Sequence, residues 1–167
     1  MKKYLVLLIV FFTAFIISCK DSILTDEDLA FKGIMETNEK GELIGEVDNE
    51  DWLEQWNYPE KDSNGNMIPL TYSVKPAYPN PTKRFTTLRY SVPFDDSVHI
   101  ELDDRVMNKK TVLLSKKMKA GYYSLYVDLK YGNPELVRKD GLVRLYFRVP
   151  TKEKFPLVYG DLKVISE

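Results

Sequence analysis

The sequence has very few of the residues that build metal centres and disulfide frameworks. It contains one cysteine and one histidine among 167 residues. Zinc fingers and disulfide scaffolds need several such residues at fixed spacings, so both classes are excluded. The chain also lacks an excess of one charge, with 24 basic and 25 acidic side chains. This balance argues against nucleic-acid binding, because nucleic-acid proteins show a basic surplus in their composition.

The sequence also lacks the motifs of an active site. No motif places a nucleophile and an acid beside His99, the single histidine. The sequence contains no glycine-rich phosphate loop and no nucleophile elbow. We therefore expect a protein that is not an enzyme and that holds no cofactor or metal.

The N-terminus lacks a hydrophobic run long enough to cross a bilayer. Lys2 and Lys3 precede an uncharged apolar segment at residues 4–17, which is shorter than the roughly 20 residues that a spanning helix needs. A positive start followed by a short apolar run is typical of a signal peptide.

Residues 16–19, Ile-Ile-Ser-Cys, resemble the bacterial lipobox. The resemblance implies cleavage after a signal peptide at residues 1–18 and lipidation of Cys19. Each buried CH₂ of an acyl chain contributes about 0.8 kcal/mol, and several chains anchor a protein stably. We expect a lipid-anchored envelope protein at the outer membrane, on its periplasmic face or the cell surface. An ordinary secretory signal and an uncleaved anchor are the alternatives.

Charge is strongly segregated along the chain. Residues 20–60 carry a net charge of −10, and residues 61–167 carry +7. We interpret residues 19–66 as an acidic tether. Within it, the stretch Asn38-Glu39-Lys40-Gly41 separates two short apolar runs, which predicts a hairpin turn.

Trp52 and Trp56 also lie in this acidic region, at positions i and i+4 of a possible helical turn. One interpretation is a pair of stacking platforms for a ligand. The other is an aromatic clip that packs the acidic segment onto the domain, since tryptophan is usually mostly buried.

From residue 68 onward, apolar and polar residues alternate with the period of a half-buried strand. The predicted strands cover residues 68–74, 86–92, 98–102, 111–115, 122–127, 143–149 and 157–165, the last broken at Gly160. No segment after residue 60 is typical of a helix. The fold class is therefore all-β, an immunoglobulin-like antiparallel β-sandwich of about seven strands over residues 67–167.

Tyr78-Pro79-Asn80-Pro81 is the most specific string in the chain. With Thr-Thr-Leu-Arg-Tyr-Ser-Val-Pro at 86–93, it resembles the start of the immunoglobulin-like domain of flagellar hook-capping proteins. It equally resembles the related C-terminal sorting (Por) domains of type IX secretion. Residues 120–128 and 140–146 continue the resemblance, which implies an immunoglobulin-like fold. A sorting tail usually ends a large cargo protein, whereas this chain has an N-terminal lipobox.

These patterns predict an envelope lipoprotein that carries a non-catalytic binding or assembly module. Its expected partners are the membrane, through Cys19, and a protein of the envelope, with no nucleic acid. A secretion-associated sorting or adaptor protein is one alternative. A carbohydrate-binding surface is another, with the two tryptophans and the exposed Tyr122 and Tyr126 as stacking side chains.

Overall fold

The computed structural model describes residues 33–45, 47–52, 60–61, 64–65, 67–104, 109–132, 134–138, 140–153 and 155–166. The predicted signal peptide, Cys19 and Trp56 lie outside these ranges. Within them, no helix has the length and apolar character needed to cross a membrane.

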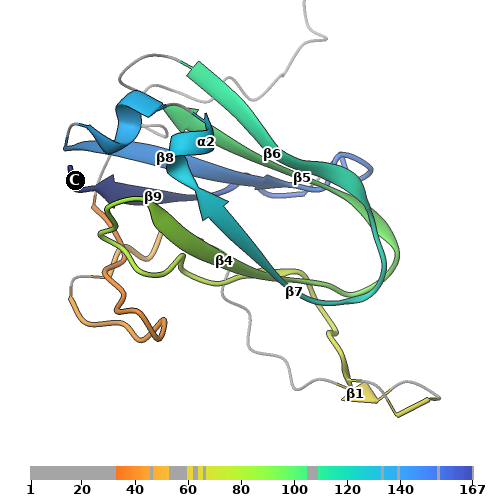
Figure 1. Ribbon diagram of the computed structural model, residues 1–167. Coiled ribbons are helices and arrows are strands. Elements are labelled where there is room, and N and C mark those ends of the chain that lie inside the picture. The colour runs from red at the N-terminus through yellow and green to blue at the C-terminus, as the bar shows by residue number, and fades with distance from the viewer. Residues whose placement is uncertain are drawn as a thin grey trace, which may run out of the picture. The chain divides into compact units, whose positions relative to one another are not determined.

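Strands of the described chain pair into two antiparallel sheets (Figure 1). The three-stranded sheet has the order β3 (Ser73–Val74), β4 (Phe85–Val92) and β7 (Gly121–Asp128). The four-stranded sheet has the order β6 (Lys109–Met118), β5 (Asp96–Asp104), β8 (Gly141–Arg148) and β9 (Val158–Val164). The chain passes between the sheets from β4 to β5, from β6 to β7 and from β7 to β8. This connectivity is that of an immunoglobulin-like β-sandwich, as predicted.

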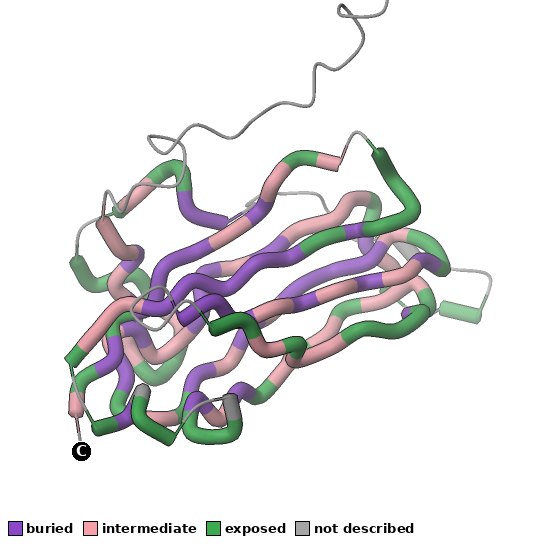
Figure 2. Tube along the Cα trace, turned by 90° about the horizontal axis from the view of Figure 1, so that it is seen from above, coloured by how far each residue is buried: buried purple, intermediate pink, exposed green. Residues whose placement is uncertain are grey.

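The core lies between the two sheets because alternate residues of each strand point inward. Leu88 and Val92 of β4 are fully buried, as are Ile100 of β5 and Leu162 of β9. Figure 2 shows buried positions concentrated along the strands, with exposed positions at the loops and outer strands. The predicted alternation is therefore confirmed by burial.

The remaining elements are short. β1 (Glu60–Lys61) and β2 (Met67–Ile68) form a two-stranded ribbon. One helical turn, α2 (Leu129–Gly132), and a 3₁₀ turn, η1 (Pro134–Val137), follow β7. These turns were not predicted, because their apolar residues are too few to show a helical period. Leu129 is fully buried and fixes this segment to the core.

The structure moves the start of the domain toward the N-terminus. Residues 33–45 and 47–52, here called the strap, pack on the sandwich, so the predicted boundary at residue 67 is too late. Thr37 pairs with Leu43, and Gly41 lies between them at φ 79°, which confirms the predicted hairpin turn. Met35 is buried, and the Thr37 amide donates to the Asn80 carbonyl at 2.8 Å.

Candidate functional site

Asn80, at the centre of the Tyr-Pro-Asn-Pro motif, is a structural side chain and is completely buried. Its Nδ2 donates to the carbonyl oxygens of Met35 and Asp161, both at 2.9 Å. Its Oδ1 accepts a hydrogen bond from the Lys163 amide at 3.0 Å. The side chain therefore occupies the position of a neighbouring strand along the outer edge of β9 and also holds the strap. Uncovered strand edges promote aggregation, so this edge is protected.

The other motif residues position Asn80. Tyr78 and Thr87 exchange two backbone hydrogen bonds, of 3.0 and 2.7 Å, which fix the motif to β4. The Pro79 carbonyl accepts from the Thr86 hydroxyl at 3.2 Å, and both prolyl bonds of the motif, before Pro79 and before Pro81, are cis. The motif thus joins the two sheets.

Asp51 and Trp52 cover the β9 edge from Tyr159 to Asp161. The Trp52 amide donates to the Tyr159 carbonyl at 2.6 Å, and Asp51 Oδ2 accepts from the Asp161 amide at 3.0 Å. The Trp52 ring occupies the space beside Gly160, where a Cβ atom would lie 2.0 Å from the indole. This contact requires a glycine at position 160, and β9 is continuous there because Gly160 pairs with Leu145 of β8, so the predicted break is wrong.

The burial of Trp52 corrects the prediction of a stacking platform at this position. Only 7% of Trp52 is exposed, so its ring faces are not available to a ligand. The clip interpretation fits Trp52, and Trp56 lies outside the described residues. Any aromatic binding surface must therefore be sought elsewhere.

A buried ion pair lies beside this covered edge. Arg144 is completely buried, and its Nε and Nη2 each donate to the Asp161 carboxylate at 2.6 Å. The guanidinium also lies 4.1 Å from the centre of the Tyr159 ring. Burial alone would lower the pKa of Arg144, but the hydrogen bonds and charge of Asp161 raise it above its ordinary value. Arg144 is therefore charged at every physiological pH.

Asp51 makes the attachment of the strap dependent on pH. Burial raises the pKa of Asp51 to about 7, whereas an unfolded aspartate titrates near 3.9. Between these values the folded state binds more protons than the unfolded state, so stability falls as the pH rises through this window. In the described structure Asp51 Oδ1 is buried without a hydrogen-bond partner.

The pKa of Asp51 lies about three units above its unfolded value, which at about 1.4 kcal/mol per unit corresponds to at most about 4 kcal/mol. Because solvent screening reduces this value, we expect Asp51→Asn to stabilise the protein by about 2 kcal/mol at pH 8. The amide oxygen still accepts from Asp161, but no charge is buried. Urea unfolding of both proteins between pH 4 and 8 measures the difference, which should nearly vanish at pH 4. An equal difference at both ends of the range would contradict the assigned titration.

The outer face of the three-stranded sheet is the aromatic face, defined by Phe85, Tyr122, Tyr126 and the adjoining Tyr131. Exposed fractions are 52% for Tyr122, 65% for Tyr126 and 83% for Tyr131. Phe85 and Tyr126 stack with ring centres 5.2 Å apart. The exposure of Tyr122 and Tyr126 agrees with the alternation of β7. Large exposed aromatic side chains gathered on one face usually mark a binding surface.

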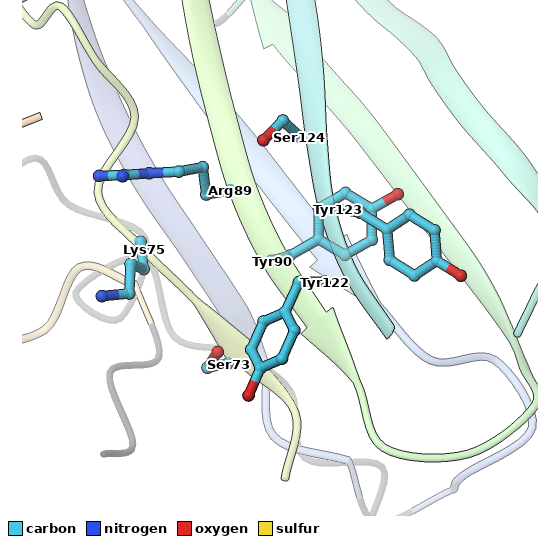
Figure 3. Close-up of a pocket in the computed structure, with 7 residues that line it drawn as sticks. All are labelled: Ser73, Lys75, Arg89, Tyr90, Tyr122, Tyr123 and Ser124. Atoms are coloured by element: carbon cyan, nitrogen blue, oxygen red, sulfur yellow. The ribbon is translucent and has the colours of Figure 1, made fainter. Parts of the chain in front are cut away.

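A groove of about 200 Å³ lies next to Tyr122 on this face (Figure 3). The lining residues come from β4, β7 and the end of β3: Ser73, Lys75, Arg89, Tyr90, Tyr122, Tyr123 and Ser124. Two of them are cationic and none is acidic. The Arg89 guanidinium lies 4.5 Å from the centre of the Tyr78 ring, so the strap-binding motif also supports this groove. This groove is called the cationic groove below.

Comparison with known proteins gives no relative: no family model, no curated protein and no solved structure matches the chain. Among the residues that the structure describes, no three histidine, cysteine, aspartate or glutamate side chains are grouped so that they could hold a metal ion. The aromatic face and the cationic groove are therefore the features from which a function can be argued.

Sequence reasoning missed Phe85, Lys75 and Arg89 as parts of a site. The missing information is the register between β4 and β7. Arg89 lies opposite Ser124, and Ser91 lies opposite Tyr122. Arg89 and Tyr122 are therefore diagonal neighbours. The alternation of each strand indicates which residues face outward, but not which outward residues of two distant strands become neighbours.

Proposed function

We propose that this protein is a lipid-anchored, non-catalytic module of the bacterial cell envelope that binds carbohydrate on its aromatic face. Lipidation of Cys19 supplies the anchor. The observation that carries the binding role is the exposure of Tyr122 and Tyr126 on one face of β7, beside the cationic groove. A sugar ring has an apolar face of C–H groups and a polar rim, and it therefore suits an exposed aromatic ring with polar neighbours.

The polar residues between the rings favour carbohydrate over a protein surface. Thr87 and Ser124 are outward-facing neighbours of the aromatic rings on β4 and β7. The centre of a protein interface is usually a continuous apolar patch from which charges are depleted. A ligand rich in hydroxyl groups can instead bond to the polar positions while its rings contact the aromatic ones.

A second candidate is an assembly or secretion adaptor that binds an envelope protein. Tyrosine and arginine are enriched among the residues that dominate protein binding energy, and the aromatic face carries both. The Tyr-Pro-Asn-Pro motif does not itself supply this contact, since Asn80 is completely buried and bonded to the strap and β9. A protein partner would therefore use the same aromatic face.

The test uses the full lipidated protein on phosphatidylcholine vesicles with a panel of fluorescent polysaccharides. We expect the wild type to float with the vesicles and to carry bound polysaccharide. Cys19→Ser should remain in the soluble fraction, because the acyl chains are lost. Tyr122→Ser/Tyr126→Ser should float normally but lose at least about tenfold in polysaccharide affinity, equivalent to about 1.4 kcal/mol.

Ile44→Ser is the matched control, because Ile44 is 62% exposed but lies on the strap. It should behave as the wild type in both measurements. Flotation of Cys19→Ser would contradict the anchor. If no polysaccharide binds, or if the tyrosine variant binds as well as the wild type, the carbohydrate role is wrong.

A further inference from the structure

Arg89 is a half-buried cation that pairs with no carboxylate of the described residues. Within the described part of the chain its guanidinium makes no ion pair, and its Nε is buried without a hydrogen-bond acceptor. The guanidinium stacks on the Tyr78 ring, and its Nη2 lies against Gly41 of the strap. By contrast, Arg84 on the same face donates to both carboxylate oxygens of Asp128, at 2.9 and 2.7 Å. Arg84 is thus neutralised by Asp128, whereas no described carboxylate neutralises Arg89.

Stacking also prepares Arg89 for a ligand. A guanidinium held against an aromatic ring keeps its planar set of donors while its side-chain freedom is reduced. A ligand that bonds to it therefore loses less conformational entropy on binding. Figure 3 shows Arg89 and Lys75 reaching toward the same side of the groove, with Tyr122 and Ser124 on the neighbouring strand.

We propose that the cationic groove binds the carboxylate of an acidic sugar within a polysaccharide, with Arg89 as the residue that selects for it. This inference rests on the proposed carbohydrate role and specifies its ligand as a polyuronate. A carboxylate matches the guanidinium because both are planar and can form two parallel hydrogen bonds. Lys75 adds a second positive charge in the same groove.

The neighbouring tyrosine supplies the contact for the sugar ring itself. Arg89 and Tyr122 are diagonal neighbours across β4 and β7, and diagonal positions are about 7–8 Å apart. This separation suits a ring on Tyr122 whose carboxylate reaches Arg89. Tyr126 is four residues from Tyr122 on the same face of β7, about 13 Å further along the strand. The stacked pair of Tyr126 and Phe85 can then contact a later sugar of the same chain.

The test compares polygalacturonate with its fully methyl-esterified form, which has the same backbone without the charge. Affinity electrophoresis of the full protein in gels that contain each polymer gives the two dissociation constants. We expect the wild type to bind polygalacturonate at least about tenfold more tightly than the ester. Arg89→Gln should remove most of this preference by weakening binding of polygalacturonate much more than binding of the ester. Tyr122→Ser should weaken binding of both polymers.

Lys116→Gln is the matched control, because it removes one exposed positive charge from β6 of the other sheet. It should retain the preference, and circular dichroism should show that all variants are folded. Equal binding of the two polymers with dependence on Tyr122 would overturn the acidic-sugar inference and leave the carbohydrate role intact. The inference would also be overturned if Lys116→Gln lost the preference for polygalacturonate as much as Arg89→Gln does. Retardation by poly-glutamate as strong as that by polygalacturonate would overturn it as well. Binding of neither polymer contradicts this inference, whereas the polysaccharide panel tests the broader role separately.

Discussion

Replacing Asp161 by alanine is expected to lower the free energy of unfolding by about 3–5 kcal/mol, the usual cost of leaving a buried charge without its partner. Arg144 is completely buried and makes two hydrogen bonds of 2.6 Å to the Asp161 carboxylate. Without that carboxylate, a guanidinium would remain in a site that excludes water. Urea denaturation at pH 7 of the variant and the wild type measures the loss directly.

The double variant Arg144→Leu/Asp161→Leu is the informative control. Removing both charges also removes the desolvation penalty, and pairs replaced by apolar residues are often nearly neutral in stability. We therefore expect the double variant to be more stable than Asp161→Ala. If the single variant loses less than about 1 kcal/mol, the pair is not the buried, unhydrated contact described here.

Asn80→Ala is expected to cost about 3 kcal/mol, because each buried polar group left without a partner costs about 1–3 kcal/mol. The substitution removes the partners of the Met35 and Asp161 carbonyls and of the Lys163 amide. The strap should detach as well, since Met35 is held by the same side chain. Urea denaturation gives the stability, and limited proteolysis followed by mass spectrometry reports cleavage within the strap.

Asn80→Asp separates the donor role from the acceptor role. The aspartate keeps an oxygen for the Lys163 amide but points a carboxylate oxygen at the two carbonyl groups. At pH 7 it should be at least as destabilising as Asn80→Ala. A wild-type stability for Asn80→Asp would show that the two donated hydrogen bonds contribute little.

The strands were predictable because their signal is local. In β4, Leu88, Tyr90 and Val92 alternate with polar residues, and each is buried as its period requires. Because every second residue faces the core, this alternation can be recognised in one strand without knowing its partner. The same rule failed for Arg144, which alternates as an outward residue of β8. It is buried because Asp161 lies directly opposite on β9, and this pairing is not visible in either strand alone.

The strap was misread for a related reason. Its many acidic residues give the segment the average composition of a solvated tether. Its attachment to the sandwich, however, depends on a few individual side chains. Met35, Thr37 and Trp52 are buried, and so is the acidic Asp51, whereas Glu39, Glu42 and Glu50 are exposed. Composition over such a segment cannot show that isolated side chains find partners in a motif at residue 80 or a strand near residue 160.

The closure of the β9 edge also fixes an order of events in folding. The contact between Asp51 and Asp161 spans 110 positions of the chain, and such distant contacts form slowly because a large loop must close first. The binding position for Asp51 and Trp52 is complete only after β9 has paired with β8. The strap therefore docks late during folding, and its release should be among the first local openings of the native state. The aromatic face, built from β4 and β7, can form without waiting for that step.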